Sequence, residues 1–339
     1  MITREINIGS VKLGGENPVR IQGMLKSSLD NIGALVEEAG RMIKAGAEII
    51  RCAIPDKKYA GPVHEALKRF SVPLVADCHF QSGIALEAVR AGFQKVRLNP
   101  GNMSKDGMKE AIELASEHEI ALRFGYNTGS CDARTGEELA EAALKTDEWV
   151  REQGFSNFLI SMKSPSVGHT VEANRFFSVY SDTPLHIGIT ATGLKDEGLI
   201  RSAAAIGALL IDGIGDTVRV SLTGDSIEEI KAACILRDMT SEKIKKLRLV
   251  SCPTCSRSRM DVVRQMDEFI EKLSEEDLKK PVKVAIMGCE VNGPGEAKEC
   301  DIGVCGTEKG ALFIKDGRIV SPVDAGNIAG FLIDELRKL

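Results

Sequence analysis

The chain has 339 residues, 43% of them hydrophobic and 27% charged, which excludes a disordered, collagen-like or coiled-coil protein. Its net charge of −5 disfavours a general binder of nucleic acid or membrane surfaces, because such proteins need a basic surface. No apolar run is long enough to span a membrane and Met1–Glu5 begins no signal peptide, so we expect a cytoplasmic protein. In that reducing compartment, nine cysteines indicate buried thiols, catalysis or metal binding rather than disulfides.

Short β-rich runs and helix-period segments alternate along the first two thirds of the chain. We predict strands at 19–23, 49–53, 74–77, 95–98, 121–125, 157–162, 185–190 and 217–221. Helical patterns lie between most of them, including 32–45, 84–91, 109–117, 137–152 and 226–237. This alternation predicts parallel strands with crossover helices, and eight strands favour a closed (β/α)8 barrel over an open doubly wound sheet.

A change of pattern near residue 240 predicts a domain boundary. The charged stretch 241–246 ends the alternation, so we expect a barrel over 1–240 and a smaller α/β domain over 241–339. In the second domain we predict a helix at 260–273, a strand at 282–287 and a final amphipathic helix. Strands at 310–314 and 318–320 would form a hairpin turned by Asp316 and Gly317.

Cations recur where the barrel strands end. Active sites of such barrels form at the carboxyl ends of the strands, and there the sequence places Arg51, Arg97, Arg123, Lys163 and Arg219. Asp77, His79, Asn99 and Asn127 follow strands three to five. Several cations at one mouth predict a phosphate-bearing ligand, although any one of them could be an ordinary ion-paired residue. His79 could be a general acid, a phosphate donor or a core histidine.

Cysteines cluster in the second domain. Cys252 and Cys255 form a C-x-x-C pair, whose thiolates can point to one metal centre, and Cys289 follows them. Glu296, Cys300 and Cys305 are candidates for a fourth ligand. The pattern is typical of either structural zinc or a [4Fe–4S] cluster, and a cluster with one oxygen ligand would have one exchangeable iron.

The chain resembles the bacterial 4-hydroxy-3-methylbut-2-enyl diphosphate synthase family over nearly its whole length. The strings that carry the resemblance are LNPGN (98–102), GIGDTVRVSLTGD (213–225), CPTCSR (252–257) and MGCEVNGPGE (287–296). The resemblance implies a [4Fe–4S] cluster on Cys252, Cys255, Cys289 and Glu296. It also implies a substrate pocket lined by Arg51, His79, Arg97, Asn99, Arg123, Asn127, Lys163, Arg219 and Ser221, and a head-to-tail homodimer in which one subunit's cluster covers the other's barrel.

The implied activity is the two-electron reductive ring opening of 2-C-methyl-D-erythritol 2,4-cyclodiphosphate to 4-hydroxy-3-methylbut-2-enyl diphosphate. Electrons would come from flavodoxin or ferredoxin, Glu296 would release the reacting iron, and His79 is the candidate proton donor. The chain departs from the family where Gln81, Gly83 and Ala191 replace an aspartate, an arginine and a glutamate, and at QGMLKS (22–27). A paralogue acting on another phosphorylated molecule, or a catalytically silent metal-binding scaffold, therefore stays open as an alternative.

Overall fold

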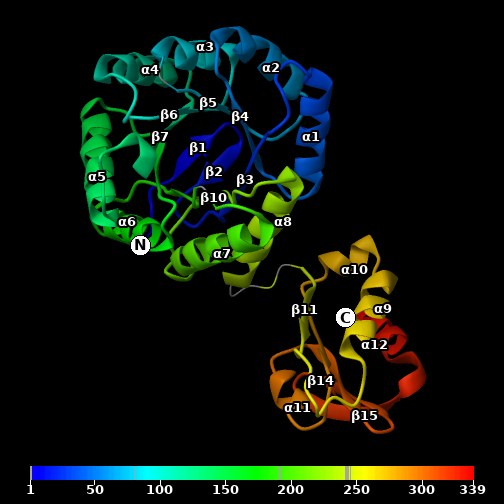
Figure 1. The fold of residues 1–339 in the computed structure, drawn as a ribbon. Helices are drawn as coiled ribbons and strands as arrows, with labels where there is room; N and C mark the ends of the chain where they lie inside the picture. Colours follow the sequence, from blue (N-terminus) through cyan, green and yellow to red (C-terminus); the bar gives the residue numbers. More distant parts are fainter. Residues whose placement is uncertain (1, 80, 191, 241–243, 245) are drawn as a thin grey trace. The chain divides into compact units, whose positions relative to one another are not determined.

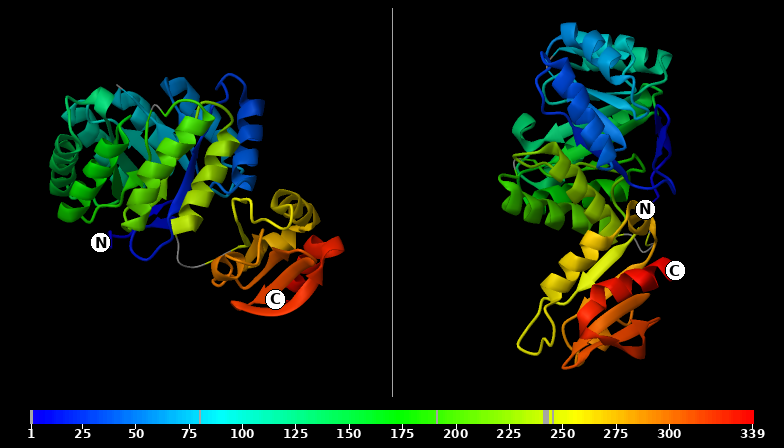
Figure 2. Two further views of the ribbon diagram at one scale, coloured as in Figure 1. Left: turned by 60° about the horizontal axis from the view of Figure 1, so that its bottom comes forward. Right: turned by 90° about the vertical axis from the view of Figure 1, so that its right-hand side faces the viewer.

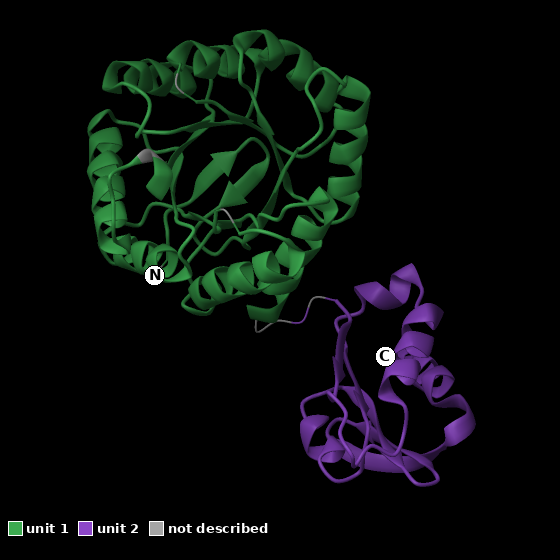
Figure 3. Cartoon of the chain, in the orientation of Figure 1, with its two compact units in different colours: residues 1–240 green, residues 241–339 purple. Residues whose placement is uncertain are grey.

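The computed structural model describes residues 2–79, 81–190, 192–240, 244 and 246–339. The chain divides into two compact units, residues 1–240 and residues 241–339 (Figure 3). Among the described helices, none combines the length and the apolar character needed to cross a membrane.

The first unit contains eight parallel strands in one sheet. Their spatial order is β8 (Phe158–Lys163), β7 (Ala121–Asn127), β6 (Lys95–Leu98), β5 (Leu74–Asp77), β4 (Ile49–Ala53), β3 (Arg20–Met24), β10 (Thr217–Val218) and β9 (His186–Ile187). A parallel bridge between Ile160 and Leu185 joins the two ends of this sheet. The closed (β/α)8 barrel is therefore confirmed over the open sheet, although β9 and β10 are shorter than the sequence predicts.

Helices surround the strands in a ring (Figure 1). They are α1 (Ile32–Lys44), α2 (Ala60–Leu67), α3 (Ser82–Ala91), α4 (Lys105–Glu117), α5 (Gly136–Glu152), α6 (Val167–Tyr180), α7 (Lys195–Ile211) and α8 (Ser226–Thr240), with short 3-10 turns η1 (Lys57–Tyr59) and η2 (Thr128–Ser130). Strand alternation sends Val96 and Leu98 outward into the apolar core beneath the helices. The alternate residues Lys95 and Arg97 are therefore directed to the inside of the barrel.

An N-terminal hairpin covers the amino end of the barrel. Strands β1 (Ile6–Ile8) and β2 (Val11–Leu13) pair antiparallel, and the right-hand view of Figure 2 shows them at one end of the strands. Their apolar residues form one cluster with barrel residues: Ile6, Ile8, Leu13, Ile49, Val75, Ala121 and Leu159. This plug, which the sequence analysis did not predict, leaves the carboxyl end as the side from which a ligand can enter.

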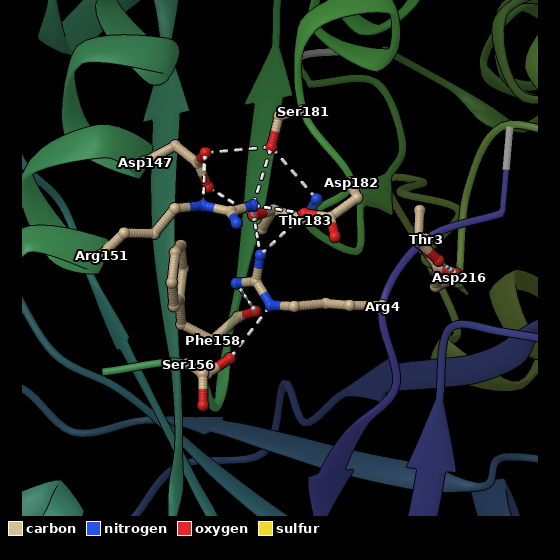
Figure 4. A network of polar contacts seen from close by, with 10 residues as sticks. All are labelled: Thr3, Arg4, Asp147, Arg151, Ser156, Phe158, Ser181, Asp182, Thr183 and Asp216. Carbon is tan, nitrogen blue, oxygen red and sulfur yellow. Dashed lines mark hydrogen bonds and ion pairs between the residues drawn. The ribbon is translucent and has the colours of Figure 1, made fainter. Parts of the chain in front are cut away.

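A polar network ties the N-terminal segment to the barrel beside this plug (Figure 4). The Arg4 guanidinium lies 4.4 Å from the centre of the Phe158 ring and pairs with Asp182 at 3.3 Å. Arg151 also pairs with Asp182, and its Nε lies 3.0 Å from the buried Asp147 carboxylate. The network therefore joins the chain start to α5 and to the loop before β9.

Asp147→Ala should destabilise the protein. The carboxylate accepts hydrogen bonds from Arg151, from Ser181 at 2.9 Å and from Thr183, so its loss leaves buried donors without a partner. We expect the free energy of unfolding in urea to fall by about 3 kcal/mol. The control is Glu148→Ala, which removes the exposed neighbouring acid and should change it by less than about 0.5 kcal/mol. Equal effects of the two changes would contradict this assignment.

The second unit is a five-stranded mixed sheet. In order it comprises β11 (Arg248–Ser251), β12 (Lys283–Met287), β13 (Ile302–Thr307), β14 (Gly310–Lys315) and β15 (Arg318–Asp324), with the first three parallel and the last two antiparallel. Its helical segments are α9 (Val262–Lys272), α10 (Glu275–Lys279), α11 (Gly293–Glu296), η3 (Ala325–Asn327) and α12 (Ile328–Lys338). The hairpin turns at Asp316 and Gly317, which have φ angles of 48° and 71°. The sequence analysis did not identify β11 and β13.

The two faces of this sheet bury different groups. Phe269 of α9 and Leu332 of α12 pack with Ile286 on one face. On the other face, Met287 packs with Cys300 and Cys305. The cysteines therefore lie on the face opposite the two long helices.

Candidate functional site

The five cations predicted at the strand ends gather inside the barrel. Arg97 and Arg123 are 3% and 2% exposed, Arg51 and Lys163 are also buried, and the Arg219 side chain is 19% exposed. Each of the others acts electrostatically on Lys163. The residues that sequence reasoning proposed for phosphate binding therefore form one group rather than separate surface residues.

Two buried carboxylates face these cations. Asp77 pairs with Arg51 and lies 3.4 Å from both Arg97 and His79. Burial alone would raise the pKa of Asp77, but Arg51, His79 and Arg97 hold it well below its usual value. Asp77 is therefore a carboxylate at neutral pH, and it balances only part of the positive charge around it.

Glu229 is the second carboxylate. It lies 3.4 Å from Arg219 and 2.8 Å from Lys26. Lys26 belongs to the 22–27 segment that departs from the family, and it also donates to the carbonyls of Leu222 and Gly224. Lys26 thus joins the loop after β3 to the loop after β10.

Several guanidinium N–H groups are buried without a hydrogen-bond partner among the described residues. They are the Nε groups of Arg51, Arg97, Arg123 and Arg219, together with Nη2 of Arg123. Nη1 of Arg123 donates to Ser161 at 2.8 Å. Unpartnered buried donors are costly, and on cations they indicate a site for an anionic ligand with several oxygen atoms.

Glycines provide the room that these cations occupy. A side chain at Gly188 would lie 2.9 Å from Nζ of Lys163, and one at Gly125 would lie 2.8 Å from Nε of Arg97. Burial lowers the pKa of Lys163 well below its usual value, and the neighbouring arginines lower it further. Within the described residues, no carboxylate pairs with Lys163, which leaves its amino group available to a ligand.

A cavity of about 1000 Å³ lies at the carboxyl end of the strands. The loops after β5 to β9 line it, with His79, Asn99, Gly101, Asn102, Asn127, Thr128, Gly129, Cys131, Asp132, Pro165 and Thr190. Nε2 of His79 lies 2.7 Å from Nη1 of Arg97. His79 therefore connects the cavity wall with the cations below it.

Ser221 stays a predicted pocket residue. Its carbonyl accepts a hydrogen bond from Thr192, and the serine hydroxyl that bonds Arg123 belongs to Ser161, which the sequence analysis did not name. Gln81 and Gly83 lie at the start of α3, whereas Ala191 lies outside the described residues. Sequence reasoning missed Gln22, Lys95 and His186 inside the barrel, although strand alternation from Arg97 would have located Lys95.

Backbone N–H groups lie next to the sulfur atoms of two of the cysteines predicted to bind metal. Gly288 donates to Sγ of Cys252 at 3.1 Å. The N–H groups of Asn292, Val291 and Gly293 lower the pKa of Cys289. The surroundings of Cys289 therefore favour the thiolate, the form in which cysteine binds metals, and the sulfur of Cys252 accepts one backbone N–H.

The other candidate ligands differ in exposure. Cys255 and Glu296 are exposed, while Cys305 is buried and burial raises its pKa to about 12, with Cys289, Cys252 and Glu296 adding to the effect. Cys305 thus lies near three of the four predicted ligands. Within the described parts of the chain, no three histidine, cysteine or acidic side chains are close enough to hold one metal ion.

Gly125→Ala should weaken anion binding without changing any charge. The added methyl group would lie 2.8 Å from Nε of Arg97 and 3.0 Å from Oγ of Ser161, so the guanidinium must move. A misplacement of about 1 Å in an active site can lower the reaction rate about a hundred-fold. We expect a displaced guanidinium to lower pyrophosphate affinity, measured by calorimetry, at least about ten-fold. Gly61→Ala, where the methyl group would meet open space, is the control. Unchanged affinity in Gly125→Ala would place the ligand elsewhere.

Comparisons with known proteins agree with this architecture. Residues 3–234 match the GcpE TIM-barrel domain and residues 248–338 match the GcpE protein C-terminal domain. A solved dihydropteroate synthase from Yersinia pestis has a TM-score of 0.52 and 19% identity, over 69% of this chain and 98% of that one, and this similarity shows the barrel fold alone.

Curated relatives named 4-hydroxy-3-methylbut-2-en-1-yl diphosphate synthase (flavodoxin) match the whole chain. The relative from Caldanaerobacter subterraneus is 40% identical over 100% of this chain and 97% of its own length. The relative from Aquifex aeolicus is 38% identical over 99% and 96%. With both domains matched and these identities over its full length, the chain belongs to the GcpE family, and the resemblance found in its sequence is confirmed.

Proposed function

We propose that the chain is an iron–sulfur reductase that converts 2-C-methyl-D-erythritol 2,4-cyclodiphosphate to 4-hydroxy-3-methylbut-2-enyl diphosphate and water. The observation that carries this proposal is the group of buried arginines with unpartnered N–H groups inside the barrel. A diphosphate offers the charge and the oxygen atoms that such a group can bind. The names of the full-length relatives favour this reaction over one on another phosphate ester.

The cations fit the charge change of the reaction. Two electrons and one proton break the bond between carbon 2 and its phosphate oxygen and remove the hydroxyl of carbon 3 as water. The freed phosphate oxygen stays unprotonated, so the opened ring carries one more negative charge on its terminal phosphate. Arg123 and Lys163, which have no carboxylate partner among the described residues, are placed to stabilise that developing charge.

The second unit offers thiolates and an acid for a [4Fe–4S] cluster on Cys252, Cys255, Cys289 and Glu296. The N–H groups directed at Cys252 and Cys289 fit such a group, because hydrogen bonds to sulfur tune the reduction potentials of iron–sulfur clusters. When bound, the cluster would supply the two electrons. Glu296 is exposed, so as the fourth ligand it can move away without breaking packing contacts.

His79 is the candidate proton donor to the departing hydroxyl. Its side chain is 38% exposed and lines the cavity, while Arg97 and Asp77 hold its ring. Flavodoxin or ferredoxin would deliver the electrons in the cytoplasm. A head-to-tail homodimer would bring the cluster of one subunit to the barrel of the other.

Anaerobic turnover of the cyclic diphosphate with a strong reductant tests the activity. Arg123→Met should lower turnover by at least about a hundred-fold, because it removes the buried cation that has two unpartnered N–H groups. Arg90→Met, a change of an exposed arginine on α3, is the control and should behave as wild type. Absence of turnover by an iron-loaded wild type would instead favour the paralogue or the silent scaffold.

Iron and sulfide content tests the cluster. Anaerobically purified protein should be brown and contain about four iron and four sulfide ions per chain. Cys289→Ser should lose both, whereas Cys300→Ser should keep them because Cys300 packs in the core of the sheet. Stoichiometric zinc without sulfide would overturn the proposal. Loss of the cluster in Cys305→Ser would show that Cys305, rather than Glu296, is the fourth ligand.

A further inference from the structure

A second polar layer lies inside the barrel, between the cations and the apolar plug. It consists of Gln22 from β3, Lys95 from β6 and His186 from β9, which are 1%, 0% and 0% exposed. Lys95 precedes Arg97 by two residues on the same inner face of β6, so it lies one step closer to the amino end. Branched apolar residues usually fill this part of a (β/α)8 barrel. An amine, an imidazole and an amide in their place need a physical reason.

The hydrogen bonds of this layer are incomplete. Nζ of Lys95 donates to Oε1 of Gln22 at 2.9 Å, and Nδ1 of His186 lies 2.6 Å from Oγ1 of Thr217. Among the described residues, Nε2 of Gln22 and Nε2 of His186 have no partner, and neither does Nη2 of Arg123. Three buried nitrogen atoms from three strands therefore lack a hydrogen-bond partner.

The charges around this layer indicate that the partner is an anion rather than water. Burial lowers the pKa of both Lys95 and His186 well below their usual values, and Arg123 and Arg51 lower both further. Arg51 (β4) and Arg123 (β7) act on both Lys95 and His186, and Lys163 (β8) also acts on His186. Arg123 in turn interacts with Arg97, Asp77 and Arg219 of the outer group. Water would satisfy hydrogen bonds there, but it would not offset the repulsion among these cations.

We propose that Gln22, Lys95 and His186 form the inner half of a phosphoryl-binding site, and that one phosphoryl group of the substrate binds there. The outer half is the ring of cations that includes Arg123. This inference rests on the proposed function, because only a substrate with two linked phosphoryl groups can contact both layers. It adds Gln22, Lys95 and His186 to the residues that select a diphosphate over a monophosphate.

Binding should then take up protons. An anion beside Lys95 and His186 favours their charged forms, so their pKa values rise when the phosphoryl group enters. Because binding takes up protons, the affinity for the anion falls as pH rises above the pKa values of Lys95 and His186 in the free protein. Calorimetry in buffers of different ionisation enthalpy measures this uptake directly.

The experiment titrates the full-length protein with pyrophosphate and with inorganic phosphate, without reductant, so that no turnover occurs. Lys95→Met should weaken pyrophosphate binding about ten- to a hundred-fold and reduce the proton uptake. Its melting temperature without ligand should stay unchanged or rise, because a buried amine without a countercharge is replaced by an apolar side chain. If Lys95 had a purely structural role, the substitution would lower the melting temperature. Lys109→Met, a change of an exposed lysine on α4, is the control.

The outcomes separate this inference from the proposed function. If Lys95→Met binds pyrophosphate as wild type does while Arg123→Met does not, the inner site is wrong and the diphosphate pocket stands. If Lys95→Met loses only the binding of inorganic phosphate, the inner layer holds a free anion rather than part of the substrate, and the inference is again overturned. If wild type binds neither ligand, both proposals fail. Should Lys95→Met not fold, Lys95→Gln, which can still bond Gln22, replaces it in the same measurements.

Discussion

Positive charge confined inside a closed barrel is the constraint on which the rest of this structure depends. Arginine side chains at the strand ends are largely shielded from bulk water, so they need a countercharge within the protein or from a ligand. Asp77 supplies part of it to Arg51, Arg97 and His79, and Glu229 supplies part to Arg219. The remaining positive charge is a cost to the free protein that a bound diphosphate would offset.

The scaffold directs that charge toward one opening. The N-terminal hairpin fills the amino end with apolar side chains, and the polar network around Arg4 and Asp147 fixes the segment that precedes it. At the other end, the loops after β5 to β9 form the cavity wall. Glu38 of α1 shapes the loop after β3 by accepting the N–H groups of Lys26 and Ser27. Stability is therefore concentrated at the closed end, and ligand binding at the open end.

The second unit places polar N–H groups next to two of its sulfur atoms. Cys252 accepts one backbone N–H, from Gly288, and Cys289 accepts three, which act on it more strongly than the nearby Arg257 does. Close approach of the backbone requires glycine, because a side chain at Gly288 would lie 3.2 Å from Sγ of Cys252 and 2.4 Å from Oγ of Ser258. Cys300 and Cys305, in contrast, belong to the apolar face of the sheet. At Cys289, partial charges from the backbone favour the thiolate without adding net charge to the domain.

The sequence by itself determined the (β/α)8 barrel, the separate α/β domain and the family. Hydrophobic periodicity and short motifs are local properties, so they can be recognised without knowledge of the fold. It also placed Arg51, Arg97, Arg123, Lys163 and Arg219 at strand ends, because strand patterns fix which residues end each strand. What it did not determine was the partner of each group, such as Asp77 for Arg51 or Glu229 for Lys26, which lie far apart in the chain.

Tertiary structure decided the plug, the bond from Arg123 to Ser161 and the polar layer of Gln22, Lys95 and His186. Each brings together side chains from separate strands that become neighbours only in the folded protein. A lysine in a strand reads as an exposed or edge residue until closure places it inside. Burial and electrostatic coupling are properties of the closed ring, and it is these that make Lys95 a residue of functional interest.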